Sequence, residues 1–227
     1  MGSIALFTDR YELTMLASAL RDGSHRRQCV FELFARRLPE GRRYGVVAGT
    51  GRLLELIGEF RFGPDELDFL DRAGMPADLL DVLAEWRFTG DVDGYPEGEL
   101  WFPGSPVLTV SGTFAEAVLL ETLALSVFNH DVAVASAAAR MVTAAGGRPL
   151  IEMGSRRTHE EAAVAAARAA YLAGFSSTSS CVSPSRARPT RRAGLRARRN
   201  ASGAGAARHP PRTKRSRAPP ATLIPGS

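Results

Sequence analysis

The spacing of apolar side chains changes several times along the chain, and each change predicts an element. Residues 11–20 repeat with the period of an amphipathic helix, and Asp9 with Glu12 has the spacing of a capping box before it. Residues 29–36 alternate in part and are rich in β-forming residues, which predicts a strand. Further predicted elements are a strand, a glycine-rich turn and a helix within 43–60, and short amphipathic helices at 65–74 and 76–86.

Residues 91–147 change from short runs separated by glycine and proline to segments made almost wholly of apolar residues. Glycine and proline divide residues 91–112 into short β-type runs, so several small strands are expected there. Residues 114–130 are apolar nearly all round, as in a helix buried in the middle of a domain. Residues 131–147 carry small side chains on most faces and end at a glycine pair, which predicts a helix that packs closely against a neighbour.

The pattern after residue 147 is that of a β/α repeat. Residues 148–154 predict a short strand, and Thr158 with Glu161 forms a capping box for a helix that reaches Leu172. The segment GFSSTS at 174–179 then starts a second strand. Chemistry in such repeats lies at the carboxyl ends of the strands, so residues 152–157 are expected at a functional rim.

Two arginines at this rim are the candidate binding groups. Arg156 and Arg157 stand beside the start of the predicted helix, where backbone N–H groups, the helix dipole and guanidinium groups favour phosphate or carboxylate. The alternative is that both arginines are solvated or pair with Glu160 and Glu161. Hydroxyl groups at 176–179 either contact phosphate oxygens or only cap helices.

Composition excludes several classes of protein. The chain has 227 residues, of which 44% are hydrophobic, and no run reaches the roughly 18 apolar residues of a membrane span. Acidic residues come too early for a secretory signal, and Cys29 and Cys181 are too few for a disulfide framework. A cytoplasmic protein is therefore expected.

Other candidate sites are weaker. The four histidines lack the spacing of a metal site, so no metal ligand is assigned. Gly49 and Gly51 in AGTGR lack the third glycine of a dinucleotide-binding loop, which favours a tight turn. Asn129 and His130 are interpreted as a hydrogen-bonded structural pair.

The chain divides into two parts of opposite charge. Residues 181–227 contain eleven Arg, one Lys and no acid, giving a formal charge of +12, whereas residues 1–180 carry −7. The basic segment shows no periodicity and few large apolar residues, so it is expected to be disordered. It is either an arm that binds nucleic acid or the product of out-of-frame translation of GC-rich DNA, since Arg, Pro, Ala, Gly and Ser make up 36 of its 47 residues.

Four blocks before residue 180 resemble the nicotinate phosphoribosyltransferase family, most of all its actinobacterial type. Their most specific motifs are T-D-x-Y-x-L-T-M at 8–15, F-P-G-x-P-x-L at 102–108 and E-x-G-S-R-R at 152–157. The resemblance implies a type II phosphoribosyltransferase-like α/β fold. It implies an N-terminal α/β domain at 1–130, an incomplete start of an irregular α/β barrel at 131–180, and the disordered tail at 181–227.

The resemblance also implies an activity and its partners. The family joins nicotinate to phosphoribosyl pyrophosphate, coupled to hydrolysis of ATP with Mg²⁺, in a homodimer that builds each site from both subunits. It implies that Tyr11 stacks on the pyridine ring from the partner subunit, and that Asp9 orients the helix that carries Tyr11. The resemblance further implies that Arg156, assisted by Arg157, binds the anionic substrates and that Ser179 lines the nicotinate pocket.

The sequence departs from the family after residue 179. Ser180 stands where the family has an asparagine, and the resemblance stops there. The family's phosphorylated histidine, its later phosphate loops and its magnesium-linked acids have no counterpart, and His209 in the tail is not assigned that role. The chain is therefore expected to be inactive by itself. The competing interpretation is a non-enzymatic nucleic-acid-binding protein that uses the basic tail.

Overall fold

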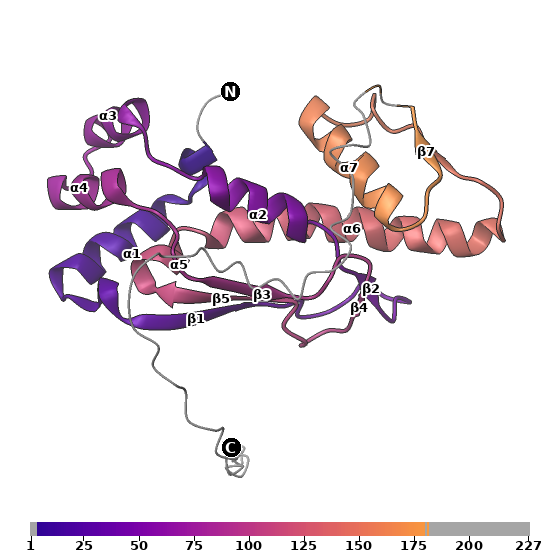
Figure 1. Cartoon of the computed structure of the whole chain (residues 1–227), viewed down its shortest axis with the longest axis horizontal. Coiled ribbons are helices and arrows are strands. Elements are labelled where there is room, and N and C mark those ends of the chain that lie inside the picture. The colour runs from indigo at the N-terminus through magenta and orange to yellow at the C-terminus, as the bar shows by residue number, and fades with distance from the viewer. Residues whose placement is uncertain (1–3, 180, 182–227) are drawn as a thin grey trace, which may run out of the picture.

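The computed structural model describes residues 4–179 and 181, which form a mixed α/β fold (Figure 1). The predictions for the tail, 181–227, lie outside the described residues except at Cys181. The helices are η1 (Ile4–Phe7), α1 (Arg10–Arg21), η2 (Ser24–Arg26), α2 (Thr50–Glu59), α3 (Pro64–Arg72), α4 (Ala77–Glu85), α5 (Phe114–Val118), α6 (Glu121–Ala145) and α7 (Glu160–Leu172). The strands are β1 (Gln28–Leu33), β2 (Gly45–Val46), β3 (Asp91–Gly94), β4 (Leu100–Trp101), β5 (Leu108–Thr113), β6 (Ile151–Glu152) and β7 (Ser177–Thr178).

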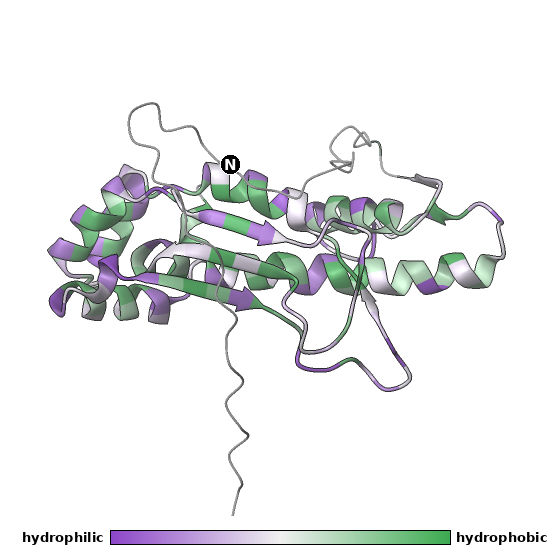
Figure 2. Ribbon diagram, turned by 60° about the horizontal axis from the view of Figure 1, so that its bottom comes forward, coloured by the Kyte–Doolittle hydropathy of each residue, from purple (hydrophilic) through white to green (hydrophobic). Residues whose placement is uncertain are grey.

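An antiparallel sheet of order β1-β5-β3 carries the main core. Val110 of β5 stands opposite Phe31 of β1 and Val92 of β3, so three apolar side chains share one face. Alternate residues of β5 are buried and half-buried, as expected for a strand that packs one face on the core. Helices α1, α4 and α5 contribute to the same hydrophobic cluster, and Figure 2 shows green and purple alternating along the amphipathic helices.

Two smaller strand pairs lie outside this sheet. β2 pairs antiparallel with β4, and β6 pairs parallel with β7. The parallel pair, with α7 between its strands in the sequence, confirms the β/α repeat predicted after residue 147. A second apolar cluster of Val46, Ala48, Ala135 and Ala169 joins β2, α6 and α7. Its small side chains confirm the close packing predicted for 131–147.

The predicted helix boundary near residue 130 is wrong. α6 runs without interruption from Glu121 to Ala145, and the break in the apolar run comes earlier, between α5 and α6. The break lies between α5 and α6 because of a tertiary contact: the carboxylate of Glu12, in α1, accepts the N–H group of Thr122 in the first turn of α6. The predicted domain division at 130/131 therefore falls within one helix and stays a prediction.

In residues 4–179, no helix combines the length and the apolar character that crossing a membrane requires.

Candidate functional site

The first predicted group lies at the start of α1. Asp9 occupies the N-cap position with extended backbone, and its carbonyl accepts a hydrogen bond from the Glu12 N–H at 3.0 Å. Its side chain makes no capping hydrogen bond, so the predicted capping box is not formed. The Tyr11 hydroxyl donates to Glu121 Oε1 at 3.0 Å, and the Tyr11 side chain is 45% exposed. Desolvation, this hydrogen bond and nearby carboxylates raise the pKa of Tyr11 to about 12, so the phenol stays protonated at neutral pH.

Glu12 caps α6 rather than its own helix. Its side chain is fully buried, and Oε1 accepts hydrogen bonds from the Thr122 N–H at 2.9 Å and from Thr122 Oγ1 at 2.7 Å. Glu12 thus supplies the capping interaction that Leu120, at the N-cap position of α6, lacks. Together, Tyr11 and Glu12 fix the start of α1 against the start of α6.

The second predicted group lies at the carboxyl ends of β6 and β7. Glu152 connects the two strands: its Oε2 accepts from Thr178 Oγ1 at 2.8 Å, and its carbonyl accepts from the Ser179 N–H at 2.8 Å. Its Oε1 accepts from the Gly154 N–H. Ser179, whose side chain is exposed, therefore lies beside the loop that carries the arginines, as the β/α repeat predicted.

The guanidinium groups of Arg156 and Arg157 are exposed at this rim. Neither forms a salt bridge to a residue in 4–179 or 181, so pairing with Glu160 and Glu161 is not what the structure shows. The backbone N–H of Arg157 donates to the Gly154 carbonyl at 2.8 Å and closes the turn. Both charges are thus available to a ligand at the start of α7.

The cap of α7 differs from the prediction. His159, not Thr158, is the N-cap residue, and its Nδ1 accepts from the Ala162 N–H at 3.3 Å. The capping box of Thr158 and Glu161 is therefore wrong by one residue, because the chain enters the helix one position later. Among the described residues no group of three or more His, Cys, Asp or Glu side chains is suited to hold a metal ion.

The structure does not bring the two predicted groups together. Figure 1 shows α1 and the β6–β7 pair on opposite sides of the molecule. Asp9 and Tyr11 belong to the α1 end, whereas Arg156, Arg157 and Ser179 belong to the rim. A cleft of about 250 Å³ between β1, β5 and α6 is lined in part by Glu121, but by none of these five residues.

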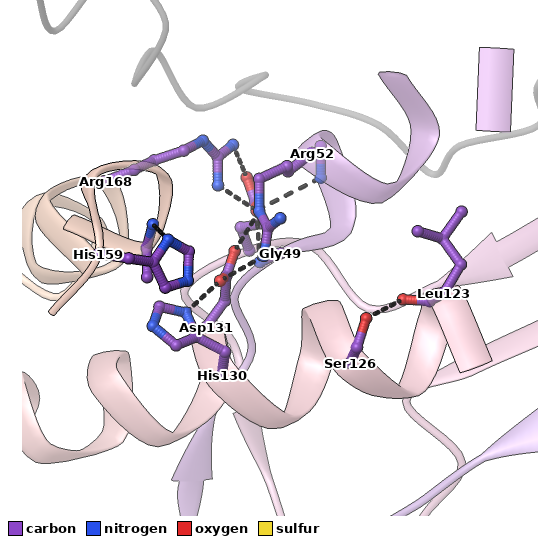
Figure 3. Close-up of polar contacts among 11 residues, drawn as sticks. Gly49, Arg52, Leu123, Ser126, His130, Asp131, His159 and Arg168 are labelled. Atoms are coloured by element: carbon purple, nitrogen blue, oxygen red, sulfur yellow. Dashed lines mark hydrogen bonds and ion pairs between the residues drawn. The ribbon is translucent and has the colours of Figure 1, made fainter. Parts of the chain in front are cut away.

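A buried polar cluster near α7 was not predicted from the sequence (Figure 3). Arg168 Nη1 and Nη2 donate to Glu97 Oε1 and Oε2, each at 2.7 Å. Arg52 binds the fully buried Asp131 through Nε at 3.1 Å and Nη2 at 2.8 Å. His130 Nδ1 contacts the same Asp131 at 2.9 Å, and among the described residues no hydrogen bond joins His130 to Asn129, so the predicted Asn129–His130 pair is not formed.

The AGTGR segment turns at Gly49, the N-cap residue of α2 with φ = +100°, and its last three residues already belong to that helix. The N–H groups of Gly49 and Gly51 donate to Glu97 Oε1 at 2.9 and 3.3 Å, so a side chain of the protein occupies the place where a cofactor phosphate would bind. The missed partners lie far apart in the sequence, Arg168 being 71 residues from Glu97. The only local signal was a charged residue, Arg168, within an alanine-rich helix.

Comparisons with known proteins agree with the resemblance of the motifs. The model for the nicotinate phosphoribosyltransferase (NAPRTase) N-terminal domain matches residues 6–129. The chain is similar to nicotinate phosphoribosyltransferase pncB1 of Mycobacterium tuberculosis H37Rv, with 71% identity over 174 residues, 77% of this chain and 39% of that protein. It is 37% identical to the nicotinate phosphoribosyltransferase of Bacillus subtilis over 179 residues, covering 78% of this chain and 36% of that protein.

Solved structures share the fold. The human nicotinic acid phosphoribosyltransferase matches with a TM-score of 0.72 and 33% identity over 78% of this chain and 37% of that chain. The nicotinate-nucleotide pyrophosphorylase of Pyrococcus furiosus matches with a TM-score of 0.60 at 24% identity, over 78% of this chain and 38% of that one, and shows the fold alone. The chain spans about two fifths of the length of the curated relatives that it matches.

Proposed function

The chain belongs to the nicotinate phosphoribosyltransferase family, and from this premise we propose that it forms the N-terminal part of an enzyme that joins nicotinate to phosphoribosyl pyrophosphate. In this reaction the bond from the anomeric carbon to a pyrophosphate oxygen breaks, and a bond from that carbon to the pyridine nitrogen forms. The products are nicotinate mononucleotide and pyrophosphate. The observation that carries the proposal is that Arg156 and Arg157, in the loop before α7, form no salt bridge with any residue of the described part of the chain.

The rim suits the charge that develops in this reaction. The sugar gains oxocarbenium character while the pyrophosphate oxygens gain negative charge, so the enzyme has mainly to position the substrates and stabilise the leaving group. Two guanidinium groups beside the N-terminus of a helix of 13 residues offer charge-assisted hydrogen bonds to such oxygens. Arg156 is the principal anion-binding residue in this proposal, and Arg157 assists it.

The α1 end has a different role in the proposal. Tyr11 stacks on the pyridine ring of the substrate bound by the partner subunit of a homodimer, Asp9 orients α1, and Ser179 lines the nicotinate pocket. The hydrogen bond to Glu121 supports this role because it holds a half-exposed aromatic ring in one orientation. The separation of the two groups in one chain supports a site that draws on two chains.

ATP and Mg²⁺ belong to the proposal only for the whole enzyme. The described residues contain no group of acidic, histidine or cysteine side chains that fits a metal ion, so no step is assigned to Mg²⁺ here. No histidine of this part of the chain is assigned a phosphoryl group. The residues present contribute binding and orientation of the anionic substrate.

A chimera tests the proposal. Residues 1–179 of this chain are joined to the remainder of the M. tuberculosis relative, and formation of nicotinate mononucleotide is measured. Arg156→Ala should lower kcat/KM by about 30- to 1000-fold, the loss of one charge-assisted contact of about 2–4 kcal/mol in a preorganised site. The matched control is Arg10→Ala, which removes one exposed positive charge from the first turn of α1.

Two results would contradict the proposal. One is a chimera that folds but forms no nicotinate mononucleotide. The other is a loss for Arg10→Ala as large as that for Arg156→Ala, since the rim would then have no special part in the reaction.

A further inference from the structure

Glu97 is the point at which three segments of the chain meet. It lies in the loop between β3 and β4, and its side chain is 5% exposed. Its two carboxylate oxygens accept hydrogen bonds from Nη1 and Nη2 of Arg168 in α7. It also accepts the N–H groups of Gly49 and Gly51 at the start of α2. Three of these four donors share Oε1, and Arg168 Nη2 reaches Oε2, so the contact uses both oxygens of the carboxyl group.

The two glycines leave room for this arrangement. A Cβ on Gly51 would lie 2.8 Å from Arg168 Nη2 and 3.4 Å from Glu97 Oε2, so a side chain at this position would force the guanidinium to shift relative to Glu97. Gly49 has φ = +100°, and a Cβ there would lie 3.0 Å from the Val127 side chain. The AGTG turn thus forms a receptor for a carboxylate and admits the arginine that pairs with it.

α7 has few other directional contacts with the rest of the molecule. The apolar cluster that it shares with β2 and α6 has a buried centre of small side chains, Val46, Ala48, Ala135 and Ala169, and Tyr44, Val134, Ala139 and Leu172 pack against it partly buried. Its four buried side chains are small and bury little area each. A bidentate ion pair between side chains only 5% and 10% exposed fixes both distance and orientation. Since the rim loop leads directly into α7, the position of this helix determines where Arg156 and Arg157 stand.

We propose that Glu97, Arg168 and Gly51 are positioning residues, which dock α7 on the start of α2 and so place the arginine rim. The inference rests on the proposed function only in that the rim is the anion site. It also explains why Arg168 is buried in an alanine-rich helix, since a buried guanidinium is tolerated only beside a partner of this kind. Reversal of the two charges should not restore the contact, because an arginine at position 97 cannot accept the N–H groups of Gly49 and Gly51.

Gly51→Ala with Gly58→Ala as matched control gives the sharpest test. Both glycines lie in α2, but a Cβ at Gly58 meets nothing within 4 Å. In the full 227-residue chain, Gly51→Ala should increase amide hydrogen exchange of residues 153–172 by about tenfold or more, while α1 changes by less than about twofold. Gly58→Ala should leave both regions unchanged. Equal exchange in residues 153–172 of the two variants would overturn the proposal.

Glu97→Gln and the double variant Glu97→Arg/Arg168→Glu provide a second measurement on the same chain. Both variants should increase amide hydrogen exchange of residues 153–172, as Gly51→Ala does. If Glu97→Gln keeps the protection of residues 153–172 against exchange, the carboxylate is unnecessary and the proposal is overturned. If the double variant restores this protection, any ion pair between the two positions is sufficient, which would also overturn the proposal.

Titration of inorganic pyrophosphate separates the inference from the proposed function. If the unaltered chain binds pyrophosphate and Arg156→Ala weakens binding, Gly51→Ala should weaken it by about fivefold or more and Gly58→Ala should not. Unchanged binding in Gly51→Ala would overturn the positioning role and leave the anion site intact. If the unaltered chain binds no pyrophosphate yet Gly51→Ala still releases α7, the docking role is supported and the anion site is contradicted.

Discussion

At the scale of single residues, Glu12 and Glu116 are buried carboxylates in unlike surroundings. Glu116 Oε1 accepts from the N–H and hydroxyl groups of Thr89 at 2.8 and 2.6 Å, and Oε2 from those of Thr113 at 2.8 and 2.7 Å. Desolvation raises the pKa of Glu116, but these hydrogen bonds together outweigh it and the net shift is downward. Desolvation also raises the pKa of Glu12, and there the hydrogen bonds from Thr122 are too few to reverse the shift.

Glu116→Gln should lower the free energy of unfolding at pH 7 by about 2–3 kcal/mol, because an amide NH₂ then faces two donors of one threonine. The folded protein holds this carboxyl with a lowered pKa. Its stabilising effect is therefore complete above the ordinary pKa of glutamate and is lost as the pH falls through the lowered value. Urea unfolding of both proteins at a series of pH values should show the difference shrinking toward acid pH. A difference that grows toward acid pH would contradict this account.

Glu12→Gln should have the opposite pH dependence. The raised pKa means that the folded protein binds a proton more readily than the unfolded chain, so the contribution of Glu12 is most favourable below the ordinary pKa of glutamate and declines as the pH rises through the raised value. Glutamine keeps an oxygen for the Thr122 donors without the buried charge. In urea unfolding, the free energy of unfolding of this variant should therefore increase relative to that of the unaltered chain as the pH rises. A variant that becomes progressively less stable than the unaltered chain toward pH 7 would argue against this account.

At the scale of elements, α6 and α7 pack through small side chains. Ala135 is fully buried in the cluster with Ala169, whereas Ala144, about two and a half turns further along α6, is exposed. Ala135→Leu should lower the free energy of unfolding by about 1–3 kcal/mol through overpacking, while Ala144→Leu should be close to neutral. Urea unfolding of the two variants checks this, and equal stability would mean that the α6–α7 contact is looser than described.

The elements that the sequence predicted well are those whose signals are local. Amphipathic spacing placed α1, α3 and α4 within one or two residues, and proline and glycine marked the strands between 91 and 113. The break between α5 and α6 was missed because Leu119 and Leu120 carry no turn signal. It depends on Glu12, more than a hundred residues away, whose carboxylate receives the N–H of Thr122.

The candidate site divides in the same way. Strand, loop and helix after residue 147 placed Arg156, Arg157 and Ser179 at one rim, because the connection between parallel strands is local in sequence. The contact of Glu97 with Arg168 and the AGTG turn joins three distant segments, and no spacing rule connects them. Their roles in catalysis stay predictions.

At the scale of the whole molecule, the 227-residue chain should not complete the reaction by itself. It spans about two fifths of its curated relatives, and its rim is built on only two described strands, β6 and β7. Given nicotinate, phosphoribosyl pyrophosphate, ATP and Mg²⁺, the purified chain should form no nicotinate mononucleotide above background, while the chimera does. Turnover by the chain alone would show that the matched part contains all the catalytic groups.

The length of α6 has a genetic consequence under the proposed dimer. From Glu121, beside Tyr11, to Ala135, against α7, the helix separates its two contacts by about 20 Å, so one small substrate does not reach from one to the other. Tyr11 and Arg156 of one chain then belong to two different active sites of the dimer, although one gene encodes both. When a chain altered at Tyr11 pairs with a chain altered at Arg156, one active site of the dimer contains both altered residues and the other contains neither. Under the proposed dimer, two inactive alleles should therefore complement each other.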